Sequence, residues 1–159
     1  LQYLLEEAVT IRDMGTILDV LSAYAPLTPD PVALTARVRE ALGRAIVQAL
    51  FPAPADVEVL ALDPALESLL SQALAPGAEA AVLEPGLAET VLTRTAALAR
   101  EQEDRGLPPV LLAPPAGRWG LSRFLRRAVP ALRVLAPTEI PDSRLIRVVA
   151  LIGPATPSA

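Results

Sequence analysis

The sequence predicts an α+β protein, with an N-terminal helical subdomain followed by a small α/β subdomain that has a mixed sheet. Two observations support this fold class. Up to about residue 51, apolar residues recur at intervals of three and four, as they do along one face of a helix. From residue 56 onward, short apolar runs of strand character alternate with amphipathic segments of helical length. We therefore expect subdomains at 1–54 and 55–153, and a flexible tail at 154–159.

The first subdomain is predicted to hold three helices. The first is already under way in the opening apolar stripe, which repeats at helical spacing. Thr10 and Asp13 have the spacing of a capping box, which would restart the chain as a second helix. Asp30 is expected to cap the third helix, with Pro31 at its first position. Phe51 and the proline-rich residues after it should end this helix and mark the subdomain boundary.

Strands and helices alternate in the second subdomain. Residues 57–62 have the pattern of a strand, and Asp63 is placed to cap the helix that follows. Residues 109–112 are continuously apolar, as expected for a strand covered on both faces. The other expected elements are a turn at Pro76-Gly77, a strand at 81–83, a helix from 85 to about 104 with Gly106 as its C-cap, a helix at 117–128, and strands at 133–135 and 145–152.

The composition excludes several kinds of chemistry. None of the 159 residues is cysteine or histidine. Disulfides, Cys-ligated zinc and Ser-His-Asp catalysis are therefore excluded, and the commonest metal ligand is missing. Every cationic side chain is arginine, which also excludes a Walker-type lysine. We accordingly expect no enzyme activity, no cofactor and no metal site.

Charge and hydropathy narrow the class of partner. The net charge of -4 argues against a general nucleic-acid binder. Apolar residues make up 52% of the chain, enough for a core, but no apolar stretch reaches the roughly 20 residues that cross a bilayer. We expect this chain to be soluble by itself. Because the sequence opens in the middle of an amphipathic pattern, we also expect it to be a fragment of a longer protein.

One candidate anion site lies at residues 117–120, where a predicted helix begins. Arg118 follows Gly117 there, and a helix N-terminus beside an arginine is a suitable environment for an anion. The segment lacks both the spacing of a dinucleotide-binding loop and a P-loop lysine. The alternative is a simple strand-to-helix turn, in which Trp119 is a packing or contact residue.

Arginines form one basic patch in this part of the sequence. Arg123, Arg126 and Arg127 share one side of the predicted helix, opposite its apolar side, and Arg118 and Arg133 lie nearby in the sequence. The patch is either a docking surface for an acidic partner or the solvated face of an amphipathic helix.

Acidic residues cluster at the end of the preceding long helix. Glu101, Glu103 and Asp104 all fall in its last turn, where the helix dipole disfavours negative charge. The cluster has three interpretations: an interaction surface, a weak divalent-cation site or a solvated helix end.

Four segments carry a resemblance to a known family. Residues 4–13 (LLEEAVTIRD), with TILD at 16–19, match the pattern LLxExVxIRDxxTILE. Residues 34–46 match LTxxVRxALxRxI, and residues 62–70 match LDPxLExxL. Residues 109–141 match a closing pattern, PVLL…R…P…VL…EIP. In this order, and over almost the whole chain, the set resembles the type III secretion export-gate family, called FlhA in flagella and SctV in injectisomes.

The resemblance implies an interaction module. In this family, a multi-pass inner-membrane protein carries a cytoplasmic domain of four subdomains, which assembles as a nonameric ring. The chain would be the third subdomain, which makes most ring contacts, and the fourth, which contacts the ATPase stalk protein, the gatekeeper and chaperone–substrate complexes. It would lie at the cytoplasmic face of the bacterial inner membrane, joined to it only through the absent N-terminal region. The resemblance does not distinguish a flagellar from a virulence system.

Charged helix faces are the candidate sites of such a module. The candidates for subunit interfaces are Arg12, Asp13, Arg37, Glu40 and Arg44. Arg12 and Asp13 have an alternative local role in the helix cap. The candidates for partner docking are Arg118, Arg123, Arg126 and Arg127. A rival interpretation is a small α/β nucleotide- or anion-binding enzyme domain that uses residues 117–120, and a third is a transcriptional or RNA-binding module.

Overall fold

The computed structural model describes residues 1–73 and 85–153. The predicted turn at Pro76-Gly77, the strand at 81–83 and the tail at 154–159 lie outside these residues. The chain divides into two compact units. Unit 1 holds Leu1–Ala55 together with Thr138–Leu145, and unit 2 holds Asp56–Pro137 together with the residues from Ile146 onward.

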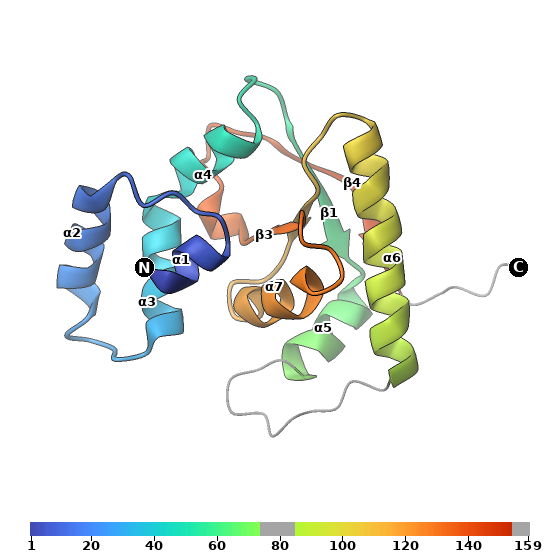
Figure 1. Cartoon of the computed structure of the whole chain (residues 1–159), viewed down its shortest axis with the longest axis horizontal. Helices are drawn as coiled ribbons and strands as arrows, with labels where there is room; N and C mark the ends of the chain where they lie inside the picture. Colours follow the sequence, from blue (N-terminus) through green and yellow to red (C-terminus); the bar gives the residue numbers. More distant parts are fainter. Residues whose placement is uncertain (74–84, 154–159) are drawn as a thin grey trace, which may run out of the picture. The chain divides into compact units, whose positions relative to one another are not determined.

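Unit 1 is helical, as predicted, but its third predicted helix is divided. Asp30 caps that helix and Pro31 opens it, as expected, yet the helix ends and a new one begins around Leu42. Gly43 at this break lies so close to the backbone of Glu139 that any Cβ would overlap the Glu139 carbonyl oxygen. The helices of unit 1 are α1 (Gln2–Glu6), α2 (Met14–Tyr24), α3 (Pro31–Ala41) and α4 (Gly43–Leu50) (Figure 1).

The start of α2 differs from the predicted capping box. The helix begins at Met14, and its N-cap is Asp13 rather than Thr10. The Asp13 Oδ1 accepts a hydrogen bond from the Thr16 amide at 3.1 Å, whereas the Thr10 hydroxyl oxygen accepts one from the Arg12 amide at 3.3 Å. The capping-box prediction is wrong because Asp13 is itself the N-cap residue, and not the acidic residue three positions after the N-cap. The predicted bond from a backbone amide to the N-cap side chain does form, but from Thr16 to Asp13 and not from residue 13 to Thr10.

Residues 138–145 belong to unit 1, although the sequence placed them in the second subdomain. The Arg144 guanidinium donates from Nη2 to the carbonyl oxygens of Phe51 and Ala53, at 2.9 and 3.0 Å. Ile140 is buried, and Gly43 contacts the backbone of Glu139. The sequence could not show this assignment, because the segment lies between two strands of unit 2 and its packing partners in unit 1 are about 90 residues away in the sequence.

Unit 2 is an α/β layer with the strand order β3-β2-β1-β4. All the strand pairs within the described residues are parallel, so the α+β class is confirmed, while these four strands form a parallel sheet rather than the predicted mixed one. Neighbouring strands are joined by long connections rather than tight hairpins, and such connections produce parallel pairs. The elements of unit 2 are β1 (Val57–Leu62), α5 (Pro64–Ala73), α6 (Pro85–Asp104), β2 (Val110–Leu112), α7 (Arg118–Arg126), β3 (Arg133–Leu135) and β4 (Ile146–Ile152). A short 3-10 helix at Pro137–Glu139 begins at the last residue before the chain passes into the 138–145 segment of unit 1.

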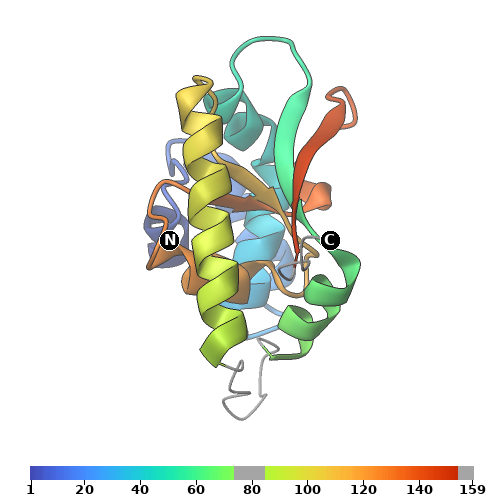
Figure 2. The same cartoon turned by 90° about the vertical axis from the view of Figure 1, so that its right-hand side faces the viewer.

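The core of unit 2 lies between the sheet and its helices. Leu60 pairs in register with Leu111 on one side and Ala150 on the other, so these side chains share a face of the sheet. Buried side chains from α5, α6 and α7 pack on that face in one apolar cluster, which includes Leu66, Leu70, Val91, Ala99, Leu121 and Leu125. Figure 2 shows α6 running along the sheet.

Candidate interaction surfaces

A buried ion cluster centres on Arg39 of α3. Its Nε donates to Glu139 Oε1 at 2.6 Å and its Nη2 donates to Glu139 Oε2 at 3.2 Å, so the guanidinium holds this carboxylate with two bonds. Its Nη1 lies 3.2 Å from Glu7 Oε2, just after α1. The three side chains are at most 5% exposed. Buried charges persist only when they are paired, so Arg39 joins three distant segments of unit 1.

Sequence reasoning missed the role of this cluster. All three residues are fixed letters of the matched patterns, as Glu7 in LLxExV, Arg39 in VRxAL and Glu139 in EIP. One signal was available, since Arg39 stands three residues before the buried Leu42 and therefore on the core side of α3. A charged residue on such a stripe requires a buried counter-charge, but the pattern does not identify it.

Asp13 and Arg12 lie at the exposed start of α2. The Asp13 carboxylate accepts from the Thr16 hydroxyl at 2.7 Å and from the Thr16 amide at 3.1 Å. These two bonds, the hydroxyl bond first, lower the pKa of Asp13 below its ordinary value of 3.8. Asp13 thus carries the cap role that was its alternative, while the Arg12 side chain is exposed beside it.

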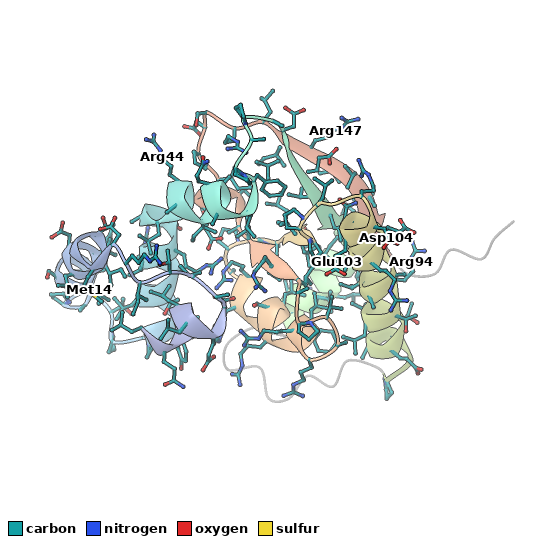
Figure 3. All side chains as sticks on the ribbon, turned by 45° about the horizontal axis from the view of Figure 1, so that its top comes forward. Met14, Arg44, Arg94, Glu103, Asp104 and Arg147 are labelled. Atoms are coloured by element: carbon teal, nitrogen blue, oxygen red, sulfur yellow. The ribbon has the colours of Figure 1, made fainter. Side chains whose placement is uncertain are left out.

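Arg37, Glu40 and Arg44 are the other predicted interface residues. Arg37 forms an ion pair with Glu40 one turn along α3 at 3.6 Å, and its guanidinium lies 5.0 Å from the ring centroid of Tyr24. The Arg37 side chain is 53% exposed. Arg44 lies on the exposed side of α4 (Figure 3). The structure therefore gives α3 and α4 charged, solvent-facing side chains.

Unit 1 also carries a groove of about 330 Å³ between α1, α2 and α3. Its lining is mainly apolar and contains no charged side chain: Leu1, Gln2, Tyr3, Leu4, Ile17, Leu21, Pro31, Leu34, Thr35 and Val38. No candidate from the sequence lies in it.

In unit 2, the predicted docking arginines separate into two groups. Arg118 is only 4% exposed, and its Nη1 donates to the Val134 carbonyl oxygen at 3.2 Å, so this guanidinium supports β3 from inside the fold. Arg123 and Arg127 are exposed and Arg126 is half-buried. The Arg123 guanidinium lies 5.7 Å from the centroid of the Trp119 ring. We call Trp119, Arg123, Arg126 and Arg127 the basic face of α7.

The start of α7 is a packed turn. Gly117 is the N-cap and makes no side-chain cap bond, and a Cβ there would lie 3.4 Å from the Ser71 hydroxyl oxygen. Arg118 is engaged with β3. This geometry favours the simple strand-to-helix turn over the anion site at residues 117–120.

The C-terminal end of α6 carries the acidic cluster. Glu101, Glu103 and Asp104 are all exposed, on the side of the helix away from the buried Gln102. Figure 3 shows Glu103 and Asp104 at this end. Gly106, with a φ of 77°, caps the helix as predicted. We call these three carboxylates the acidic end of α6.

Two kinds of feature are missing from the part of the chain that the structure describes. Across residues 1–73 and 85–153, no group of three or more acidic residues is gathered closely enough to hold a metal ion. Within the same residues, no helix combines the length and the apolar character that a membrane span requires.

A family model and similar curated proteins indicate the same family for this chain. The FHIPEP family model matches residues 1–144. The flagellar biosynthesis protein FlhA of Salmonella typhimurium is 54% identical over 153 residues, which is 96% of this chain and 22% of that protein. FlhA of Escherichia coli K12 is 53% identical over the same shares. The chain thus spans about a fifth of the length of these curated relatives.

Solved structures share the fold. The Chlamydia pneumoniae CdsV protein superposes with a TM-score of 0.81 at 26% identity, over 95% of this chain and 44% of that one. CdsV in complex with CdsO gives 0.83 at 26% identity, over 94% and 44%. The nonameric SctV-C of EPEC gives 0.73 at 22% identity, over 95% and 46%, a likeness of fold alone.

Proposed function

The chain belongs to the FHIPEP family, and on that premise we propose that it is part of the cytoplasmic domain of a type III secretion export gate. In this proposal, unit 1 forms contacts in a homo-oligomeric ring and unit 2 docks export partners. The relatives matched over nearly the whole chain are flagellar biosynthesis proteins, which favours the flagellar apparatus. The whole protein would place this chain at the cytoplasmic face of the bacterial inner membrane.

The observation that carries this proposal is the position of the charges. Arg37 and Arg44 face solvent on consecutive helices of unit 1, with the half-buried Glu40 paired to Arg37, while the buried charges of that unit are paired internally. An exposed ion pair such as Arg37–Glu40 contributes at most about 1 kcal/mol. The pair can therefore be exchanged at little cost for contacts to a neighbouring subunit. Head-to-tail contacts of this kind close into rings when the rotation permits.

Docking by unit 2 has a similar basis. The basic face of α7 combines a half-buried Trp119 with exposed Arg123 and Arg127. Tryptophan and arginine are the residue types enriched where binding energy concentrates in interfaces. We propose that this face takes part in binding the ATPase stalk protein, the gatekeeper or chaperone–substrate complexes. CdsV, which shares the fold, has been solved in complex with CdsO.

Charge reversal in unit 1 tests the ring proposal. In the complete cytoplasmic domain, the double variant Arg37→Glu/Arg44→Glu should weaken assembly about tenfold, the equivalent of about 1.4 kcal/mol, as measured by sedimentation velocity. Arg147→Glu is the matched control, because Arg147 is an exposed arginine of unit 2 outside both proposed surfaces. Assembly that is unchanged in the double variant would contradict a role for these residues.

A further inference from the structure

The acidic end of α6 is unfavourable for the isolated molecule. The C-terminus of a helix already carries partial negative charge, so three carboxylates in the last turn cost stability. Glu101 and Asp104 are also one turn apart, where like charges repel. The adjacent Arg105 offers its Nη2 to Glu58 at 3.6 Å instead. Among the described residues, no salt bridge involves the acidic end. Arg100, one turn before Glu103 and Asp104, makes no salt bridge with them either, so the acidic end has no direct ion pair within the described part of the chain.

The basic face of α7 is the electrostatic counterpart. Arg123 stands three residues before Arg126 and four before Arg127, so three guanidinium groups share one side of the helix. Trp119 precedes Arg123 by four residues and lies against it. The surface joins positive charge to a partly exposed aromatic ring. Its arginines are opposite in charge to the carboxylates of the acidic end of α6.

The two surfaces of one molecule do not meet. The C-terminal end of α6 leads into the amino end of β2, whereas α7 follows the carboxyl end of the same strand. Figures 1 and 2 show the Asp104 end of α6 and helix α7 in different parts of unit 2. A contact between these surfaces must therefore join two molecules. It would be heterologous, since each molecule contributes a different surface, and this is the geometry that generates rings or filaments.

We propose that the basic face of α7 of one copy docks on the acidic end of α6 of a second copy. This inference rests on the proposed function for ring formation, and it places a second copy of the chain on the basic face of α7 in place of the ATPase stalk protein, the gatekeeper or chaperone–substrate complexes. The basic side chains relieve the repulsion among the carboxylates, and Trp119 supplies apolar area at the contact. The contact lies in unit 2, and it is additional to the one proposed for α3 and α4 of unit 1.

Disulfide cross-linking tests the geometry, because the chain contains no cysteine. Ala97 is exposed on α6, one turn before Glu101, and Ala128 is exposed beside Arg127. We expect a mixture of Ala97→Cys and Ala128→Cys chains to form a disulfide-linked dimer under mild oxidation. Each variant alone should form several-fold less. The yield should fall sharply at about 1 M salt, where the Debye length is about 3 Å. Equal yields in the mixture and in the separate samples would refute the proposal.

A charge swap tests the chemistry. Glu103→Arg/Asp104→Arg in the Ala97→Cys chain should abolish the cross-link, and so should Arg123→Glu/Arg127→Glu in the Ala128→Cys chain. Combining the two reversed chains should restore it, because each then meets its opposite charge. Circular dichroism of every variant checks that loss of the cross-link does not reflect unfolding. If the reversed pair fails to cross-link although both chains are folded, electrostatic docking is wrong.

The unit 1 experiment separates this inference from the proposed function. Absence of the α6–α7 cross-link, together with weakened assembly of Arg37→Glu/Arg44→Glu, would overturn only the α6–α7 contact. If the cross-link is salt-sensitive, is lost in each reversed chain and is restored when the two reversed chains are mixed, the α6–α7 contact is supported. If assembly of the unit 1 variant is then unchanged, the role of unit 1 is removed. Export lost in α7 variants that still cross-link would assign the basic face to another partner, against this inference.

Discussion

The two units of this chain are stabilised in different ways. Unit 1 encloses an arginine between two carboxylates that come from segments far apart in the sequence. Unit 2 packs a parallel sheet against three helices through one aliphatic cluster. The difference implies that different substitutions will lower the stability of the two units. Unit 1 should be sensitive to the loss of a single charge, and unit 2 to the loss of side-chain volume.

Spectroscopic probes separate the units. Trp119 is the only tryptophan and lies in unit 2, whereas both tyrosines, Tyr3 and Tyr24, lie in unit 1. Tryptophan fluorescence therefore follows the unfolding of unit 2, and the tyrosine signals in near-ultraviolet circular dichroism include unit 1. Substitutions in either unit can thus be assigned to the unit that they destabilise.

The largest effect is expected for Arg39→Ala. The substitution leaves Glu7 and Glu139 buried without their shared partner, and breaking a buried ion pair in this way costs about 3–5 kcal/mol. Urea unfolding should show the loss in the tyrosine signal before the tryptophan signal. Arg44→Ala is the control, because Arg44 is exposed and surface substitutions usually change stability by less than about 0.5 kcal/mol.

A triple variant sharpens the interpretation of the Arg39 result. Buried ion pairs replaced as a set by apolar residues are often neutral or stabilising. Glu7→Leu/Arg39→Met/Glu139→Leu should therefore recover most of the stability that Arg39→Ala loses. If the triple variant is as unstable as the single one, the loss stems from packing rather than from the two carboxylates that lose Arg39.

In unit 2, Leu66→Ala should give the second largest effect. Leu66 of α5 is 1% exposed and belongs to the aliphatic cluster, and such truncations cost about 2–5 kcal/mol. Leu69 lies on the same helix but is 52% exposed, so Leu69→Ala is a matched control that should cost far less. Tryptophan fluorescence in urea measures both. Equal losses from the two would contradict the burial seen in the structure.

The same contrast explains which features the sequence predicted. Apolar periodicity is a local signal, and it located every described strand of unit 2 and the helix N-cap at Asp30. Features that depend on distant partners were missed. The division between α3 and α4 requires Gly43 to approach the backbone of Glu139, and the membership of 138–145 in unit 1 depends on Arg39 and Arg144. Periodicity carries no information about such contacts.

Candidate surfaces follow the same division. Helical spacing alone placed Arg123, Arg126 and Arg127 on one side of α7, and the structure agrees. Spacing could not show that Arg118, five residues earlier, turns inward to the Val134 carbonyl oxygen. Its burial depends on how α7 packs beside β3. Positions on one helix are therefore predictable, whereas the choice between surface and interior for a charged residue depends on tertiary contacts.

The smallest predicted effect concerns Asp13, where the charge is exposed and the interaction is local. Its lowered pKa means that the folded state binds the proton more weakly than the unfolded state does. The stabilisation is fully present above the ordinary pKa of 3.8, and it is lost as the pH falls through the lower folded value.

Asp13→Asn retains an N-cap that does not titrate. We expect the variant to lose less unit 1 stability than the parent chain between pH 5 and pH 2, as followed by the tyrosine signal in urea. Arg39 and its two carboxylates are present in both chains, so their acid response cancels in the difference. Identical acid profiles would show that the Thr16 bonds at the start of α2 contribute nothing measurable, and that unit 1 depends on its buried charges alone.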